Sequence, residues 1–482
     1  MPSIFTTDSI VSQQQKSGGK YAVYTTRWFI LLAVILLNFS YGFLCTSLTP
    51  LRPAAQAAIC NGDEEEGCIN FQLWLWIGFP IGFILTSPLI TFLIVRTGIL
   101  PAIYIAIVFS LIGVSIRFIA FSIESLTTSR YLLVLCAHGI HSFAHPIGLL
   151  LPPVISQQWF PSGQRTLATS LGILGYFVGY LTSFVLSPNV VDTTDTLRDL
   201  KNLTYICFAF AVLPLFPVLS IWENRPQLPP SASADDPLVA RRCAVPRLFN
   251  SAMCLHCIVF AFCAGAVKFT FELHNQITCQ HLHLFGFAGV YALSLIVAAA
   301  LGAVLIAGIT DTTYAHKKVY RTCLALTTIS SCVLSWANST DSHAVFVFIS
   351  LLAIGFFGVA LIAVGVELSV ESMFAQHPAK PTALLFASCA FGELVYTLVA
   401  MFGQRGLSRN QLPTPGRRCK LRGSLEDFSV VQIVVSLSLL VFFLLAFVFL
   451  RWKPKRNALE KNESISDVFH KNPLGGDLRT RC

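Results

Sequence analysis

The stretch YLLVLCAHGIHSFAHPIGLLLPP, Tyr131 to Pro153, is apolar and long enough to cross a membrane, yet it carries three histidines. A helix needs about 20 apolar residues to span the hydrocarbon core of a bilayer. His138, His141 and His145 are spaced i, i+3 and i+7, which places them on one face of such a helix. An imidazole facing lipid would be costly, so this face is expected to look at protein or at a water-filled cavity. The rest of the chain is expected to build that cavity.

The composition of the whole chain is that of a membrane protein. Hydrophobic residues make up 54% of the 482 residues and charged residues only 12%, whereas a soluble domain carries about 25% charged residues. The net charge of +9 indicates basic loops at a membrane face rather than nucleic-acid binding. The fifteen cysteines are scattered, so no metal site, disulfide scaffold or bound cofactor is expected.

Twelve apolar blocks are long enough to span a bilayer, which predicts an all-α membrane protein with both chain ends on the same side. The predicted spans are residues 28–49, 72–95, 99–122, 131–156, 165–187, 203–221, 249–272, 285–309, 320–337, 344–371, 382–403 and 429–450.

A linker rich in proline, serine, alanine and charge, residues 223–247, divides the twelve spans into two sets of six. Such a composition predicts a flexible segment. The predicted units are an N-tail at 1–27, a first half at 28–222, a second half at 248–451 and a C-tail at 452–482. Two six-helix halves form the major facilitator arrangement, in which the substrate site lies at mid-membrane between the halves.

Loop charges predict the orientation. With the N-terminus in the cytosol, 21 of the 33 Lys and Arg residues fall on the cytosolic side, so both termini are expected there. The cluster GRRCKLR, residues 416–422, is the exception. In this orientation Cys60 and Cys68 lie outside and could pair, and Asn202 and Asn338 are the outside sequons for glycosylation. The plasma membrane is expected rather than a lysosomal or other organelle membrane.

Three motifs resemble one branch of the facilitators. They are WFPSGQRTLA at residues 159–168, ITDTTYAHKK at 309–318 and GVELSVESMF at 365–374. Together they resemble the feline leukaemia virus subgroup C receptor-related family, with its haem, choline and vitamin B6 transporters, and most of all its poorly defined third branch. The resemblance implies the major facilitator fold and gating roles for Arg165 and Asp311, which belong to the first two motifs.

The chain departs from that family where choline is held. The resemblance implies an aromatic box of a span-one Trp and a span-seven Tyr, helped by Gln residues, and ring faces suit an ammonium group. Here the four positions are occupied by Cys45, Lys268, His145 and Ala390. Phe43 is the aromatic residue nearest to the first of them. A lysine in place of the tyrosine argues against choline as the substrate.

The first-half turn of the facilitators is also altered. It reads VRTGIL at residues 95–100 and lacks both the Asp and the final Arg of the D-x-x-G-x-R pattern. The gating contact that the resemblance implies for this turn is therefore in doubt.

Charged residues in the seventh span allow two interpretations. Lys268 and Glu272 are spaced i, i+4 and could form a local ion pair. Alternatively, Lys268 faces the cavity and binds an anionic group, because a charge at mid-span is costly and marks function. Gln276, at the end of the same segment, is a further candidate contact to the substrate.

Other charged residues are candidates for gating or proton transfer. Glu367 and Glu371 are close enough on a helix for one carboxylate to raise the pKa of the other, although a structural role at the gate is favoured. Glu393 is a separate proton-relay candidate. Arg117 is expected to form an internal ion pair or to contact lipid headgroups, with substrate contact as the alternative.

The histidine face has three interpretations. The histidines could hydrogen-bond neighbouring helices, contact the substrate or carry protons, since His titrates near neutral pH. His145 is the strongest substrate candidate because the resemblance places a substrate-contacting Gln there, and His141 is the next.

The expected function is that of a monomeric alternating-access transporter embedded in the lipid bilayer. Its substrate is a small organic anion or zwitterion, or else haem, whose iron an imidazole can ligate. A non-transporting receptor or scaffold is the alternative from another class. No motif of an enzyme active site is present in a suitable context.

Overall fold

The computed structural model describes residues 21–51, 55, 58–59, 71–123, 128–191, 196–235, 239, 247–281, 288–339, 344–403, 405–406, 426–427, 429–450 and 455–460. Statements about absent features below refer to these residues.

The first half of the chain contributes six long helices. They are α1 (Thr26–Thr46), α4 (Phe71–Thr97), α5 (Ile99–Ser122), α6 (Thr128–Trp159), α7 (Arg165–Val190) and α8 (Thr196–Val212), which α9 (Leu215–Val218) prolongs. Short 3-10 turns follow α1 at η2 (Thr49–Leu51) and precede α7 at η3 (Ser162–Gln164).

The second half contributes six more long helices. They are α11 (Ser251–His281), α12 (Ala288–Thr313), α13 (His316–Ser339), α14 (Ala344–Ser372), α15 (Ala379–Gly403) and α17 (Ser429–Phe449). A two-residue pairing of β1 (Arg405–Gly406) with β2 (Glu426–Asp427) lies between the last two. Within the described residues, eleven helices are long and apolar enough to cross a membrane. The remaining predicted span, residues 320–337, corresponds to α13, which is more polar.

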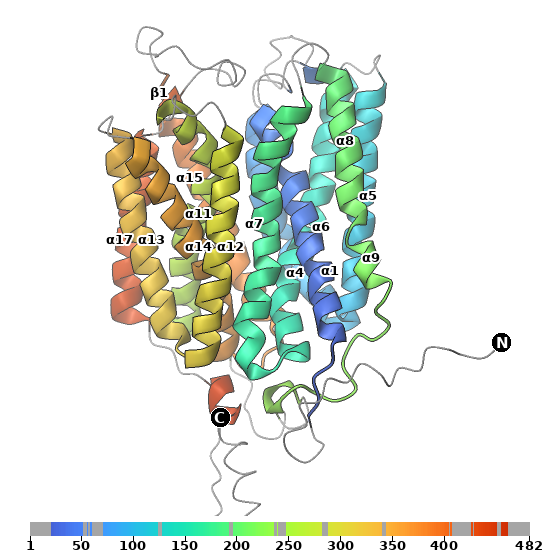
Figure 1. Ribbon diagram of the computed structural model, residues 1–482, viewed down its shortest axis with the longest axis vertical. Coiled ribbons are helices and arrows are strands. Elements are labelled where there is room, and N and C mark those ends of the chain that lie inside the picture. Colours follow the sequence, from blue (N-terminus) through green and yellow to red (C-terminus); the bar gives the residue numbers. More distant parts are fainter. Residues whose placement is uncertain are drawn as a thin grey trace, which may run out of the picture.

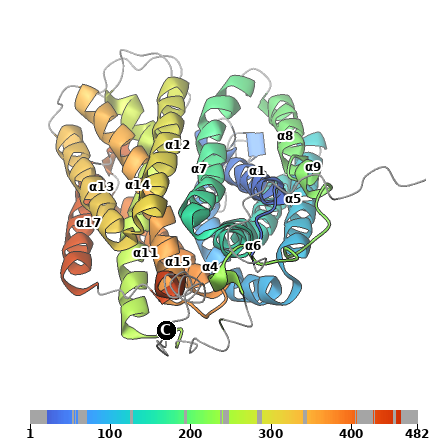
Figure 2. The same cartoon turned by 60° about the horizontal axis from the view of Figure 1, so that its bottom comes forward.

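The two sets of six form two bundles that lie side by side (Figure 1). Helices α7 and α12 run next to each other along the seam, and α4 packs against α15 on the other side of it (Figure 2). Helix α1 begins, and α17 ends, at the lower end of the bundle as Figure 1 is drawn. The lower end is the one expected to be cytosolic.

The prolines in α6 are accommodated by a residue from another helix. Pro152 lacks an N–H group, so the carbonyl of Gly148, four residues earlier, loses its helical donor. The amide of Asn38 in α1 donates to this carbonyl at 2.9 Å and to the carbonyl of Gly172 in α7 at 2.8 Å. One buried amide therefore ties three helices together and satisfies a backbone group that could find no water in a bilayer.

Part of the linker is ordered at the lower end, although its composition predicted a flexible segment. Asn224 accepts a hydrogen bond from the Leu100 N–H at 2.8 Å and so caps the start of α5. The turn before α5 is made at Gly98, whose φ of 86° favours glycine. Further along, η4 (Ala232–Ala234) lies beside the buried side chain of Ser231. Specific side-chain bonds, which composition does not reveal, hold residues 223–235.

Candidate functional site

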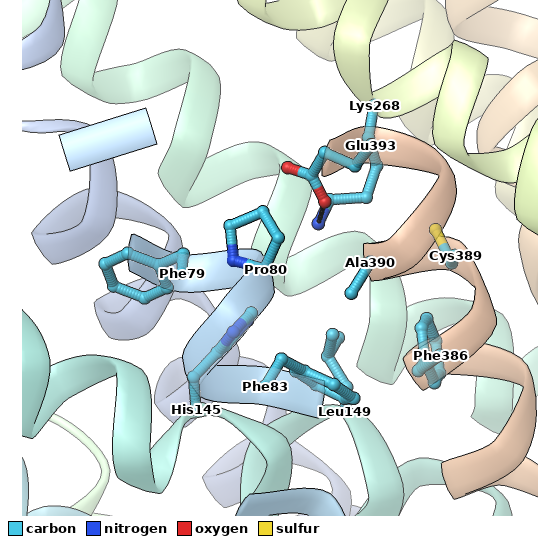
Figure 3. Close-up of a pocket in the computed structure, with 10 residues that line it drawn as sticks. All are labelled: Phe79, Pro80, Phe83, His145, Leu149, Lys268, Phe386, Cys389, Ala390 and Glu393. Carbon is cyan, nitrogen blue, oxygen red and sulfur yellow. Dashed lines mark hydrogen bonds and ion pairs between the residues drawn. The ribbon is translucent and has the colours of Figure 1, made fainter. Parts of the chain in front are cut away.

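A pocket lies between the two halves, about midway along the helices that line it. The space among its lining residues, open solvent included, amounts to about 250 Å³. Figure 3 shows the side chains that line it. The first half provides aromatic and aliphatic walls from α4 and α6, and the second half provides residues of α11 and α15. The lining residues are Phe79, Pro80, Phe83, His145, Leu149, Lys268, Phe386, Cys389, Ala390 and Glu393.

His145 is the polar residue that the first half brings to the pocket. Its side chain is buried, and its ring stacks on Tyr176 of α7 with centroids 4.9 Å apart. Phe79 and Phe83 pack edge-on against it at 5.5 and 5.6 Å. Within the described part of the chain, neither ring nitrogen of His145 has a hydrogen-bond partner. A buried polar group of this kind is costly unless a ligand or water satisfies it.

Lys268 and Glu393 form the charged part of the pocket. The Lys268 ammonium donates to the Glu393 carboxylate, which joins α11 to α15 (Figure 3). The same ammonium lies 5.6 Å from the ring centroid of Tyr176, within the range of a cation–π contact across the seam. Lys268 therefore pairs with an acidic residue far away in sequence, a partner that neither interpretation of the seventh span had named.

The histidine face divides between two environments. His138 bonds to the Leu75 carbonyl at 2.9 Å, and His141 bonds to the Ser110 carbonyl at 3.2 Å. Both rings are buried inside the first half against α4 and α5, and neither lines the pocket. The expectation that His141 reaches the substrate is thus wrong for this geometry, because α6 is surrounded by other helices and only its lower histidine turns toward the seam.

The two candidate residues of the first span, Cys45 and Phe43, lie in different surroundings. Cys45 interacts electrostatically with Lys268 and Tyr176, but it is not among the residues that line the pocket. Phe43 is fully buried and packs edge-on against Phe210 of α8 at 4.8 Å, away from the pocket. Ala390 lines the pocket, and Gln276 belongs to α11, although its side chain is outside the described set.

Arg117 is buried within the first half. Its guanidinium donates to the Ser47 hydroxyl at 2.7 Å and to the Leu44 carbonyl at 3.3 Å. It is only 1% exposed, so it does not reach lipid headgroups. Its hydrogen bonds go to α1 and to the turn after it, and not to the carboxylate that an internal ion pair would require.

Below the pocket, polar contacts join the two halves. Asp311, at the end of α12, accepts bonds from the Thr166 and Leu167 N–H groups, each at 2.9 Å. A carboxylate at the start of α7 satisfies free N–H groups and interacts favourably with the helix dipole. Glu367 of α14 accepts from Ser156 of α6 at 2.9 Å and also from Thr169 of α7.

The other two gating candidates at the lower end, Arg165 and Glu371, contact the last helical segment that the structure describes, residues 455–460. Arg456 lies between Glu367 and Glu371, so the two carboxylates share a cation and do not simply repel each other. Arg165 donates to Ser231 of the linker at 2.6 Å and lies 3.5 Å from the Glu460 carboxylate.

Above the pocket, aromatic contacts join the halves. Phe177 and Phe184 of α7 meet Phe271 and His274 of α11, with ring centroids 5.5 and 4.6 Å apart. The pocket is therefore enclosed by polar contacts on one side and by ring packing on the other.

Of the predicted outside features, only the sequons fall on described residues. Asn202 is exposed on α8, whereas Asn338 is buried at 7% exposure within α13, which disfavours glycosylation there. Cys60 and Cys68 lie outside the described residues. Among the described residues, no group of three or more His, Cys, Asp and Glu side chains is placed to hold a metal ion.

Two important contributors were missed by the sequence reasoning. Tyr176 touches both His145 and Lys268, but in the sequence it stands between Gly175 and Gly179, whose spacing is typical of helix packing and does not indicate a ligand site. Arg456 lies in a polar tail whose composition does not predict burial. The one feature of the sequence that could have drawn attention to it is an arginine only a few residues past the last predicted span.

Comparisons with known proteins agree with this architecture. The sequence profile of the Major Facilitator Superfamily matches residues 34–404. Solute carrier family 49 member A3 of Danio rerio is 26% identical over 390 residues, which cover 80% of each chain. Choline/ethanolamine transporter flvcr2a of Danio rerio is 23% identical over 393 residues, covering 78% of this chain and 80% of that one. These relatives confirm the resemblance that the three motifs carry.

The fold is also found among solved structures. The proton:xylose symporter XylE superposes with a TM-score of 0.68 at 12% identity, over 90% of this chain and 99% of that one. A bacterial homologue of the iron transporter ferroportin, in an outward-facing state, superposes with a TM-score of 0.58 at 11% identity, over 87% of this chain and 98% of that one. At these identities the likeness supports the fold alone.

Proposed function

The chain belongs to the Major Facilitator Superfamily, and we propose that it carries a small zwitterionic or anionic organic solute through the pocket between its two halves by alternating access. The main observation in favour of this proposal is that His145, whose two ring nitrogens have no hydrogen-bond partner among the described residues, lines a pocket that also holds the Lys268–Glu393 pair. A solute that satisfies His145 would remove the cost of that buried polar group.

The charge of the pocket favours a zwitterion. The Lys268 ammonium and the Glu393 carboxylate offset each other, so a strongly charged ion would leave one of them uncompensated. A solute with both an anionic and a cationic group can pair with each of them in turn. The imidazole of His145 can then donate to an oxygen of the anionic group.

A choline-like cation fits less well. Relatives from Danio rerio and Homo sapiens carry the name choline/ethanolamine transporter, and the pocket does hold aromatic rings. However, Lys268 occupies the position that the family resemblance gives to a tyrosine, and its positive charge repels a quaternary ammonium group.

Haem is the second candidate, supported by His145, because an imidazole nitrogen can ligate iron. One observation weighs against it. His138 and His141 are bonded to backbone carbonyls and away from the pocket, so His145 is the histidine that could reach the iron. A receptor or scaffold that moves no solute is the third candidate.

The proposal is tested with purified protein in vesicles. Uptake and exchange are measured for a panel that includes an amino-acid zwitterion, a betaine, simple carboxylates, choline, ethanolamine, pyridoxine and haem. We expect flux of a zwitterion or a carboxylate, reduced at least about tenfold in His145→Ala and in Lys268→Ala, since a lost bond to a charged group is worth roughly 1.5–3 kcal/mol.

His138→Gln is the matched control, because glutamine can still donate to the Leu75 carbonyl on the same helix outside the pocket. Rapid choline flux would contradict the role given to Lys268. Unchanged flux in the His145→Ala, Lys268→Ala double variant would remove both residues from the substrate site. Absence of flux for every solute would favour the receptor alternative.

A further inference from the structure

The segment that follows the last membrane helix lies against the lower end of the bundle. Residues 455–460 form a short helix, which Figure 1 shows beneath the seam in red. Arg456 is only 2% exposed. Its Nε donates to Glu371 Oε2 at 2.9 Å, and its Nη2 donates to Glu367 Oε2 at 2.8 Å. The Asn457 N–H donates to the other Glu371 oxygen at 2.8 Å.

The other end of this segment is bound to different parts of the chain. Glu460 Oε1 accepts from the Ser231 hydroxyl at 2.7 Å and from the Ser233 N–H at 3.2 Å. Arg165 at the start of α7 completes the site, with its Nη2 at 3.5 Å. Burial opposes the charged form of Glu460, but Arg165 and the serine donors outweigh it and hold the pKa of this carboxyl below its ordinary value.

Apolar packing supports these polar contacts. Leu459 is 2% exposed and packs in a small cluster with Phe374, just after the end of α14. This short helix thus places an arginine and a leucine in two separate buried sites and a glutamate in a third site that is partly buried. A tail segment attached so extensively is not expected to be a free appendage, because each buried group would have to be desolvated again on return.

The two ends of the segment belong to opposite sides of the seam. Arg456 is fixed to α14 in the second half, whereas Glu460 is fixed to α7 in the first half and to the linker. Opening the lower end requires α7 and α14 to separate, which cannot happen while one turn of helix is bound to both. The contacts of Glu367 with Ser156 and Thr169 cross the same seam beside it.

We propose that residues 455–460 are a latch that closes the lower end of the transporter, and that Arg456 and Glu460 are gating residues which must release before the pocket can open to that side. The latch does not depend on the identity of the solute. Its chemistry is that of two charged groups held in pre-formed sites, one on each half.

The latch is tested by hydrogen exchange of the full-length protein in nanodiscs. We compare Arg456→Gln and Glu460→Gln with Lys455→Gln, a control that removes one charge from the same turn. In both latch variants we expect exchange at the lower ends of α6, α7 and α14 to rise about tenfold, which corresponds to about 1.4 kcal/mol of lost closing free energy. Upper-end peptides and the control should remain as in the wild type.

Arg456→Gln leaves two carboxylates without their cation and could loosen the protein generally. Glu460→Gln, which keeps the shape of the side chain, therefore provides the decisive comparison. A rise confined to residues 455–460, or an equal rise at the upper ends of the helices, would overturn the proposal. The first result would make the segment a local appendage, and the second would make it a general packing element.

Discussion

At the residue scale, the Lys268–Glu393 pair defines the pocket and also stabilises it. The two charges lie 13% and 5% exposed on α11 and α15. Removing one partner of a buried pair costs about 3–5 kcal/mol, whereas replacing both by apolar residues is often neutral. Stability and substrate binding can therefore be separated at this pair.

The prediction for the pair concerns three variants. Lys268→Met should lower the thermal midpoint strongly, because Glu393 is left as an uncompensated buried charge, and Glu393→Leu should do the same to Lys268. The combined Lys268→Met, Glu393→Leu protein should regain most of the stability while transport stays lost. Thermal unfolding in detergent and vesicle flux measure the two properties. Full transport by the combined variant would show that neither charge contacts the solute.

The site was only partly predictable from sequence, and the reason lies in sequence distance. His145, Lys268, Ala390 and Glu393 were identified because polar or altered residues stand out in apolar spans. The ion pair considered for Lys268, as one of two interpretations, was with Glu272, since helix periodicity reveals only neighbours on the same helix. Glu393 is 125 residues away, and only the packing of α11 against α15 brings it there. Tyr176 was overlooked because an aromatic residue in an apolar span carries no mark of function.

At the scale of the element, helix α7 depends on its glycines to approach α1. The length of the apolar blocks predicted twelve long helices, because the bilayer fixes how much apolar chain is needed. Ten of them agree with the structure to within four residues at each end, whereas α8 begins seven residues before its predicted span and α11 ends nine residues after its own. Gly175 and Gly179 lie four residues apart, a spacing of small residues that is typical of a close helix contact but does not identify the partner helix. The structure identifies it as α1: a Cβ added at Gly179 would lie 1.9 Å from the Phe39 carbonyl oxygen.

The prediction for this element is that Gly179→Ala destabilises the first half. A methyl group at that distance cannot be accommodated without moving α1 from α7, and overpacking of this kind costs about 1–3 kcal/mol. Gly139→Ala is the matched control, because nothing lies within 4 Å of a Cβ at that position of α6. Fluorescence-detected size exclusion after heating measures both. Equal stability of the two variants would refute the close approach of α1 and α7.

At the scale of the whole molecule, the two closures of the pocket differ in chemistry. The lower closure uses charged and hydrogen-bonding groups, including Asp311 at the start of α7. The upper closure uses rings, such as Phe184 against His274. Weakening one closure should increase the fraction of molecules that are open on that side. The change in the free energy of opening should equal the free energy by which the lost contact stabilised the closed state.

Cys389, a native thiol buried in the pocket wall, can report this shift. In a background with the other cysteines replaced, Asp311→Asn should raise its labelling by a membrane-impermeant thiol reagent from the lower side. The rise should be roughly 2- to 30-fold, because a carboxylate at a helix start is worth about 0.3–2 kcal/mol. Phe184→Ala should instead raise labelling from the upper side. The two variants thus control each other, and an increase on the same side in both would contradict a pocket that is closed separately at its two ends.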